Sequence, residues 1–98
     1  MLIHTVLFWL RKDLSSNELE RFKAALGSLK DIPSATAVYV GSPSSTPTRP
    51  VIDESYDFCL TVLLKDMAAH DAYQESPIHL AFLENKGLWE RVQIYDAD

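Results

Sequence analysis

The segment from Leu2 to Leu10 restricts the fold most, because it reads as a β-strand and both of its faces are apolar. One face carries Leu2, Val6, Phe8 and Leu10, and the other carries Ile3, Leu7 and Trp9. In a small domain, a layer of helices covers only one face of a sheet, so the second face needs another layer. The simplest such layer is a second copy of the chain, and the strand therefore predicts a homodimer.

Length and charge narrow the class of protein. The 98 residues suit a single domain spanning residues 1–98, and 47% hydrophobic with 23% charged residues is a globular composition. Acidic residues outnumber basic ones by 14 to 9, and the basic residues are scattered along the chain. This pattern argues against a nucleic-acid partner, because phosphate binding needs clustered basic side chains.

Targeting signals are not evident in the sequence. The first apolar run is not preceded by a basic segment or followed by a small-residue cleavage site. No stretch approaches the roughly 20 apolar residues of a membrane helix, so we expect a cytoplasmic protein with no membrane partner. The one cysteine, Cys59, excludes an internal disulfide and is expected to be a small core residue.

A helix-start signal follows the first strand. Ser15 suits the N-cap, Glu18 is its reciprocal partner three residues later, and Leu14 and Leu19 are placed to form a hydrophobic staple. Apolar residues then recur at helical spacing, namely Leu19, Phe22, Leu26 and Leu29. We expect this helix to end near Lys30.

Two further strands are expected on either side of a long loop. Ala35 to Gly41 alternates small and β-branched residues, and Tyr56 to Leu64 alternates apolar residues through its length. Ser42 to Ser55 between them contains three prolines and a Ser/Thr-rich run, which is typical of an irregular connection.

The last third of the chain predicts a broken helix and a fourth strand. Asp66 can cap a helix from Met67 to about Tyr73, and Ser76-Pro77 restarts a second piece that should end at Gly87 in a left-handed cap. A strand over Leu88 to Tyr95 would place Val92 and Ile94 on one face and Trp89, Arg91, Gln93 and Tyr95 on the other. The resulting order is the α+β, ferredoxin-like βαββαβ fold with a four-stranded antiparallel sheet.

Candidate acid–base residues are few. Tyr73 and His79 flank the helix break, and His4 lies within the first strand. Histidine is the usual general base and a phenol can orient a carbonyl, which makes this pair a candidate catalytic site with His4 a weaker member. The structural alternatives are that His79 bonds the helix start, that Tyr73 is a core aromatic, and that His4 is a satisfied core or interface group.

The remaining chemistry of the sequence is sparse. His70, beside Asp71, is expected to be exposed to solvent. No H-E-x-x-H or C-x-x-C spacing and no Gly-rich phosphate loop occurs, so the sequence predicts no cofactor and no metal.

Several segments in order resemble the stress-responsive A/B barrel domain family. They are His4 with Val6-Leu7-Phe8, Leu29-Lys30-Asp31-Ile32-Pro33, Tyr56-Asp57-Phe58, Asp71-Ala72-Tyr73, Ser76-Pro77-Ile78-His79-Leu80-Ala81-Phe82 and Val92-Gln93-Ile94-Tyr95-Asp96. The resemblance implies a dimeric α+β barrel with its two sheets face to face. In olivetolic acid cyclase, a plant polyketide cyclase of this family, a histidine acts as general base beside a tyrosine, and His79 and Tyr73 match these positions.

Two departures distinguish this chain from that pattern. Ser76-Pro77 replaces a His-Pro pair, and Phe58 stands where the cyclase has a histidine in the third strand. We therefore expect a cleft for a small hydrophobic or aromatic carbonyl compound, with cyclase-like or isomerase-like acid–base chemistry. The alternatives are a non-catalytic stress-associated dimer that is structural or holds a ligand, and a monooxygenase or haem-linked relative.

Overall fold

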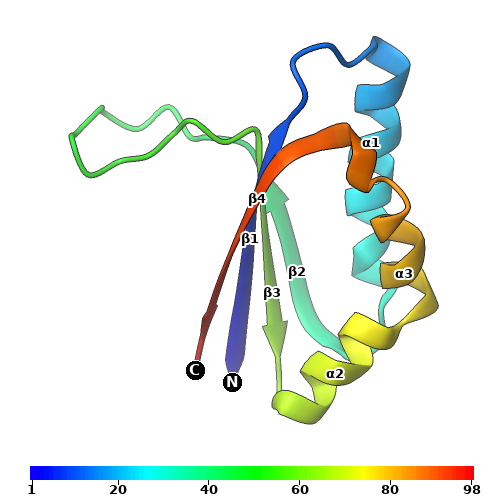
Figure 1. Cartoon of the computed structure of the whole chain (residues 1–98). Coiled ribbons are helices and arrows are strands. Elements are labelled where there is room, and N and C mark those ends of the chain that lie inside the picture. The colour runs from blue at the N-terminus through cyan, green and yellow to red at the C-terminus, as the bar shows by residue number, and fades with distance from the viewer.

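The computed structural model describes residues 1–98 and contains one four-stranded antiparallel sheet in the order β2-β3-β1-β4. The strands are β1 (Leu2–Leu10), β2 (Ala35–Gly41), β3 (Phe58–Leu64) and β4 (Trp89–Ala97). Helices α1 (Ser16–Ser28), α2 (Met67–Glu75) and α3 (Pro77–Leu83) all lie on one face of the sheet, as Figure 1 shows with the sheet nearly edge-on. The ferredoxin-like βαββαβ order expected from the sequence is confirmed.

The helices are joined to the strands by short turns. A 3₁₀ turn, η1 (Leu29–Asp31), extends α1 toward β2, and a second one, η2 (Lys86–Leu88), precedes β4. No helix has the length and apolar character needed to cross a membrane.

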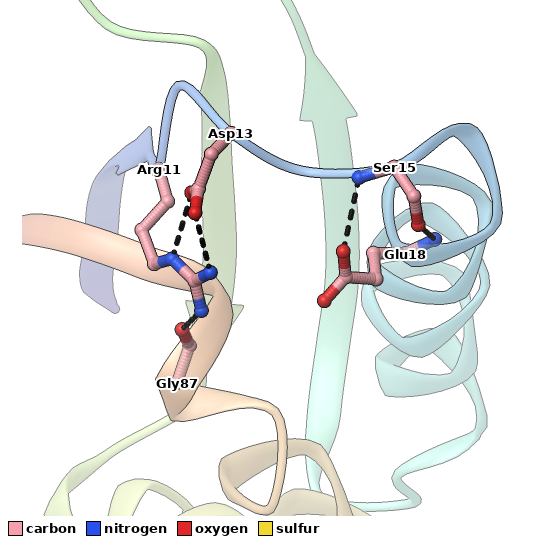
Figure 2. A network of polar contacts seen from close by, with 5 residues as sticks. All are labelled: Arg11, Asp13, Ser15, Glu18 and Gly87. Atoms are coloured by element: carbon pink, nitrogen blue, oxygen red, sulfur yellow. Dashed lines mark hydrogen bonds and ion pairs between the residues drawn. The ribbon is translucent and has the colours of Figure 1, made fainter.

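The start of α1 follows the expected pattern (Figure 2). The Ser15 hydroxyl accepts a hydrogen bond from the Glu18 backbone N–H at 3.1 Å, and the Glu18 carboxylate accepts one from the Ser15 N–H at 2.9 Å. In the preceding turn, the Arg11 guanidinium donates to both oxygens of Asp13 at 3.0 Å and to the Gly87 carbonyl at 2.9 Å. The Arg11 bonds therefore tie the turn after β1 to η2, and the Ser15 and Glu18 bonds fix the start of α1.

The hydrophobic core lies between the helices and the inner face of the sheet. Phe22, Leu26 and Leu29 on the first helical segment are fully buried against the even-numbered side chains of β1. An aromatic cluster fills one end of the core, with Phe8 and Phe22 at 5.4 Å between ring centroids and Phe82 stacked on Trp89 at 5.6 Å. Through Phe82, α3 packs against this end of the sheet.

The third strand begins later than the sequence suggested. Strand pairing starts at Phe58, whereas Tyr56 and Asp57 lie outside it. The Asp57 carboxylate accepts a hydrogen bond from the Leu10 N–H at 2.7 Å, while its own N–H donates to the Phe8 carbonyl at 2.8 Å. The Asp57 side-chain oxygen thus takes the place of a backbone carbonyl as the acceptor for Leu10. The regular pairing of β1 with β3 therefore ends at Phe8 and Phe58.

The approach to β4 also differs from the prediction. Gly87 lies within a 3₁₀ turn with no left-handed conformation, since no residue has a positive φ, and α3 ends at Leu83. The β4 strand covers Trp89–Ala97, and its register shifts opposite Trp9 and Leu10. Because of this bulge, Trp89 packs with the core on the helix-covered face, not with Arg91 on the other face.

The other face of the sheet has no layer over it. Leu7 pairs with Cys59 in register, so Cys59 lies half-buried on this uncovered face and is not part of the hydrophobic core in which it was expected. Trp9 is buried here by its neighbours, because the Arg91 guanidinium lies 4.1 Å from the ring centroid and the indole N–H donates to the Ser55 hydroxyl at 3.1 Å. The long connection between β2 and β3 projects on the same side, away from the helices (Figure 1).

Candidate functional site

An apolar cleft of about 170 Å³ lies between the sheet and the broken second helix. Nine of its 12 lining residues are hydrophobic, and the full set is His4, Val6, Phe8, Leu60, Tyr73, Gln74, His79, Phe82, Leu83, Trp89, Val92 and Ile94. The cleft therefore brings together all three candidate residues from the sequence, although they lie on β1, α2 and α3. Its mostly apolar lining with few polar groups is typical of small-molecule sites.

The helix break places Tyr73 beside His79. Ser76 ends α2 and caps α3, its hydroxyl accepting a hydrogen bond from the Ile78 N–H at 3.2 Å, and Pro77 occupies the first position of α3. The Tyr73 and His79 ring centroids are 5.0 Å apart. Tyr73 is 0% exposed and His79 is 8% exposed, so both rings are removed from solvent.

Each of these residues has one buried polar atom without a hydrogen-bond partner in the protein. The Tyr73 hydroxyl and the His79 Nδ1 atom are both buried without a hydrogen-bond partner. Such atoms are uncommon in folded proteins, and an orphaned buried polar group calls for a specific explanation. Ser76 and not His79 caps α3, while His79 has a hydrogen bond with the backbone of Gln74 near the end of α2.

The local environment controls the protonation of the pair. Burial raises the pKa of Tyr73 to about 12, so the phenol keeps its proton at neutral pH. Burial is also the main cause that lowers the pKa of His79 below 6.5, and charge on His4 lowers this pKa further. A hydrogen bond with the Gln74 backbone raises it and is the weakest of the three effects. At neutral pH the cleft thus offers a hydrogen-bond donor beside an uncharged imidazole that can accept a proton.

His4 is held on the opposite wall of the cleft. It is 3% exposed, and its Nδ1 lies 2.6 Å from an Asp96 carboxylate oxygen because the two residues pair directly in register between β1 and β4. The ring also lies edge-on to Tyr73, with 6.0 Å between centroids. Of the sequence alternatives, the structure favours a satisfied core group that borders the cleft.

Two residues near His4 were not anticipated. Asp96 received no role from the sequence, since it lies 92 residues from His4 and only the antiparallel register of β1 and β4 joins them. His70 was expected to be exposed, but its side chain is only 20% exposed and its ring centroid is 5.7 Å from that of His4. The histidine lies on the part of α2 that faces the sheet and not on the solvent side.

The sequence profile of the stress responsive A/B barrel domain family matches residues 2–98. The chain belongs to this family. This result agrees with the resemblance drawn from its strand and helix segments. Among curated protein sequences, none matches this A/B barrel protein significantly.

Several solved structures have the same fold as this A/B barrel protein. A family member from Mesorhizobium loti is 29% identical, with 99% of this chain and 94% of that chain covered at a TM-score of 0.78. A protein of unknown function from Thermobifida fusca, described as dimeric and ferredoxin-like, is 21% identical, with coverage of 98% and 88% and a TM-score of 0.79. A hydroxynitrile lyase from Passiflora edulis is 17% identical, with coverage of 98% and 90% and a TM-score of 0.80.

Proposed function

We propose that this A/B barrel protein binds a small hydrophobic or aromatic carbonyl compound in the cleft and processes it by acid–base chemistry of the cyclase or isomerase kind. The observation that carries the proposal is the pair of unsatisfied atoms, Tyr73 Oη and His79 Nδ1, in an otherwise apolar cleft. A ligand with one polar oxygen on a hydrophobic body would satisfy them while burying apolar surface. The hydroxynitrile lyase among the structural neighbours indicates that this fold is compatible with catalysis.

The proposed roles follow from the protonation states. Neutral His79 accepts a proton from the carbon next to the carbonyl, and the electron pair of that C–H bond moves onto the carbonyl oxygen to form an enolate. The Tyr73 hydroxyl donates a hydrogen bond to the developing charge on that oxygen. His79 then returns the proton to carbon, or the enolate carbon forms a C–C bond with a second carbonyl of the same molecule and His79 gives its proton to the alkoxide that results.

His4 has a supporting part in this proposal. An ionised Asp96 carboxylate can only accept, so Nδ1 of His4 carries the hydrogen in their 2.6 Å bond. The second nitrogen of His4 is then an acceptor on the ring that borders the cleft. We assign His4 to positioning the ligand, and Asp96 to fixing the tautomer of His4.

We also propose that this chain forms a homodimer through the uncovered face of the sheet. The support is the apolar surface around Leu7 and Cys59 together with the description of two structural neighbours as dimeric. Light scattering at micromolar concentration measures the mass directly. A stable monomer would contradict this part of the proposal.

The first experiment combines ligand binding with proton exchange. Wild type and His79→Ala are screened by thermal shift against small aromatic ketones, β-diketones and lactones, since a ligand of the native state raises its melting temperature. A ketone that stabilises the wild type is then incubated in D₂O, and loss of its α-proton signal is followed by NMR. All samples contain EDTA so that bound metal does not contribute.

His79→Ala should slow the exchange by about 10² to 10⁴-fold, the usual contribution of a general base. Tyr73→Phe should also slow it, while Tyr39→Phe removes a phenol that does not line the cleft and serves as the matched control. Exchange retained in His79→Ala would overturn the catalytic role. Stabilisation by a ligand with no exchange in wild type would instead favour the non-catalytic, ligand-holding alternative.

A further inference from the structure

A second polar cluster lies next to the cleft, where three elements meet. His4 on β1, His70 on α2 and Asp96 on β4 each place one ligand atom within 4.8 Å of the other two. These residues are far apart in sequence, so only the fold brings them together. His70 and Asp96 do not line the cleft, and the cluster is therefore distinct from the Tyr73 and His79 pair.

We propose that His4, His70 and Asp96 form a binding site for a divalent first-row transition-metal ion such as Zn²⁺. Two imidazole nitrogens and one carboxylate oxygen are a donor set that suits such ions. Three protein ligands also leave coordination positions open to water or to a further ligand. This site goes beyond the proposed acid–base function and does not need His79 or Tyr73, although it shares His4 and Asp96 with that proposal.

The surroundings give an ion a route from solvent. Asp96 is 49% exposed in its side chain, and with His70 it borders an open hollow of about 180 Å³. The other residues of the hollow are Leu2, Met67, Ala97 and Asp98. Water in this hollow can complete the coordination shell, while His4 supplies a buried ligand that is fixed by the core.

Only a small movement is needed to admit the ion. His4 Nδ1 and Asp96 Oδ1 are now 2.6 Å apart and share a hydrogen. Two ligand atoms at about 2.1 Å from a tetrahedral zinc ion are roughly 3.4 Å apart, so the Asp96 side chain must withdraw as the ion replaces that hydrogen. Its partial exposure near the end of an edge strand allows this shift.

The third ligand already has an orienting partner. His70 Nδ1 lies 3.2 Å from a carboxylate oxygen of Asp71, and no hydrogen bond occupies its Nε2 atom. A carboxylate on one ring nitrogen commonly orients a histidine whose other nitrogen binds metal. Asp71 would therefore act as a positioning residue for His70.

The test uses untagged protein that is stripped with EDTA and then dialysed, so that the three native histidines are the only imidazoles present. Titration with zinc chloride in a calorimeter should give one ion per chain. His70→Ala and Asp96→Asn should each weaken zinc binding at least about tenfold. Losing a residue that only supports a metal ligand already costs about 10 to 100-fold in affinity, and these two residues are proposed as ligands themselves. His79→Ala is the matched control, because it removes a histidine outside the cluster and should bind as the wild type does.

A second measurement on wild type protects the test against variants that fail to fold. Zinc should shift the NMR imidazole signals of His4 and His70 more than those of His79. The proposal is overturned if wild type binds no zinc, if folded His70→Ala binds as tightly as wild type, or if the shift is confined to His79. None of these readouts involves the ketone exchange assay, so the two proposals fail independently.

Discussion

Two polar regions of this molecule differ in how their hydrogen bonds are satisfied. At the turn before α1 and the start of that helix, Arg11, Asp13 and Ser15 are exposed and Glu18 is half-buried, and each has a partner within the chain (Figure 2). In the cleft, the Tyr73 hydroxyl and the Nδ1 atom of His79 are buried and lack a partner. The polar side chains that fix the start of α1 are therefore at the surface and hydrogen-bonded. The two candidate catalytic side chains are buried, where an unpartnered polar atom costs the most free energy.

This difference has a thermodynamic meaning. Hydrogen bonds on the surface replace bonds to water and add modestly to stability, while an unsatisfied buried group carries the whole desolvation cost. The cleft is therefore expected to destabilise the free protein, and a bound ligand would recover part of that cost. The turn before α1 should behave in the opposite way, with each loss lowering stability.

The largest effect is expected for Tyr73→Phe. This change removes an unsatisfied hydroxyl and keeps the ring, so the free energy of unfolding should rise by about 1 to 3 kcal/mol. Urea denaturation at neutral pH measures the change, with Tyr56→Phe, in the segment before β3 and outside the cleft, as the control. A loss of stability in Tyr73→Phe would mean that the hydroxyl has a favourable partner and that the contrast between the two regions is wrong.

A smaller effect of opposite sign is expected for Ser15→Ala. Removing the N-cap oxygen leaves the Glu18 N–H without its side-chain partner and should lower the free energy of unfolding by about 1 kcal/mol. Ser16→Ala changes the next serine, whose hydroxyl makes no side-chain hydrogen bond, and should have little effect. Equal losses in the two variants would argue that the capping box contributes nothing specific.

The pH dependence of the free energy of unfolding on the acidic side of neutrality tests whether His79 is buried in its neutral form. Its pKa lies below 6.5 in the folded protein, mainly through burial, whereas the unfolded chain titrates near 6.5. Between these values the unfolded chain binds more protons, so the free energy of unfolding should fall as the pH drops below about 6.5. Denaturation at several pH values should show a flatter profile for His79→Gln, and an unchanged slope would contradict the burial of a neutral imidazole.

The smallest effect is expected for Asp13→Asn. Hydrogen bonding to Arg11 lowers the pKa of Asp13, but both side chains are in water, and exposed ion pairs contribute little. Thermal melting at neutral pH should barely change, and any difference should shrink in high salt because exposed charges are screened. A large, salt-independent loss would show that the turn depends on this ion pair more than on the helix cap.

The parts of the fold that could be predicted from the sequence are those set by local rules. The bounds of β1 and β2, the Ser15 cap and the helix break at Ser76 all follow from neighbouring residues, and the structure agrees with them. Tyr73 and His79 were found for the same reason, since a short break is enough to bring two side chains together. The presence of the cleft around them agrees with the sequence, while their catalytic role is still a prediction.

The features that were missed depend on contacts between distant segments. Trp89 was assigned to the wrong face because the bulge opposite Trp9 and Leu10 has no signature in the sequence of β4. Asp96 and His70 were missed as neighbours of His4 because strand register and helix docking decide those contacts. Gly87 was expected to be left-handed, but the 3₁₀ turn that leads into β4 does not need that conformation.

The pairing of β1 with β4 also has a consequence for folding kinetics. The contact between His4 and Asp96 closes a loop of 92 residues, and the central strand has one edge unpaired until that closure occurs. Long-range pairing of this kind slows folding and leaves a strand edge open to other chains in the meantime. The cleft should therefore be among the last parts to form, and refolding yield should decline as protein concentration rises.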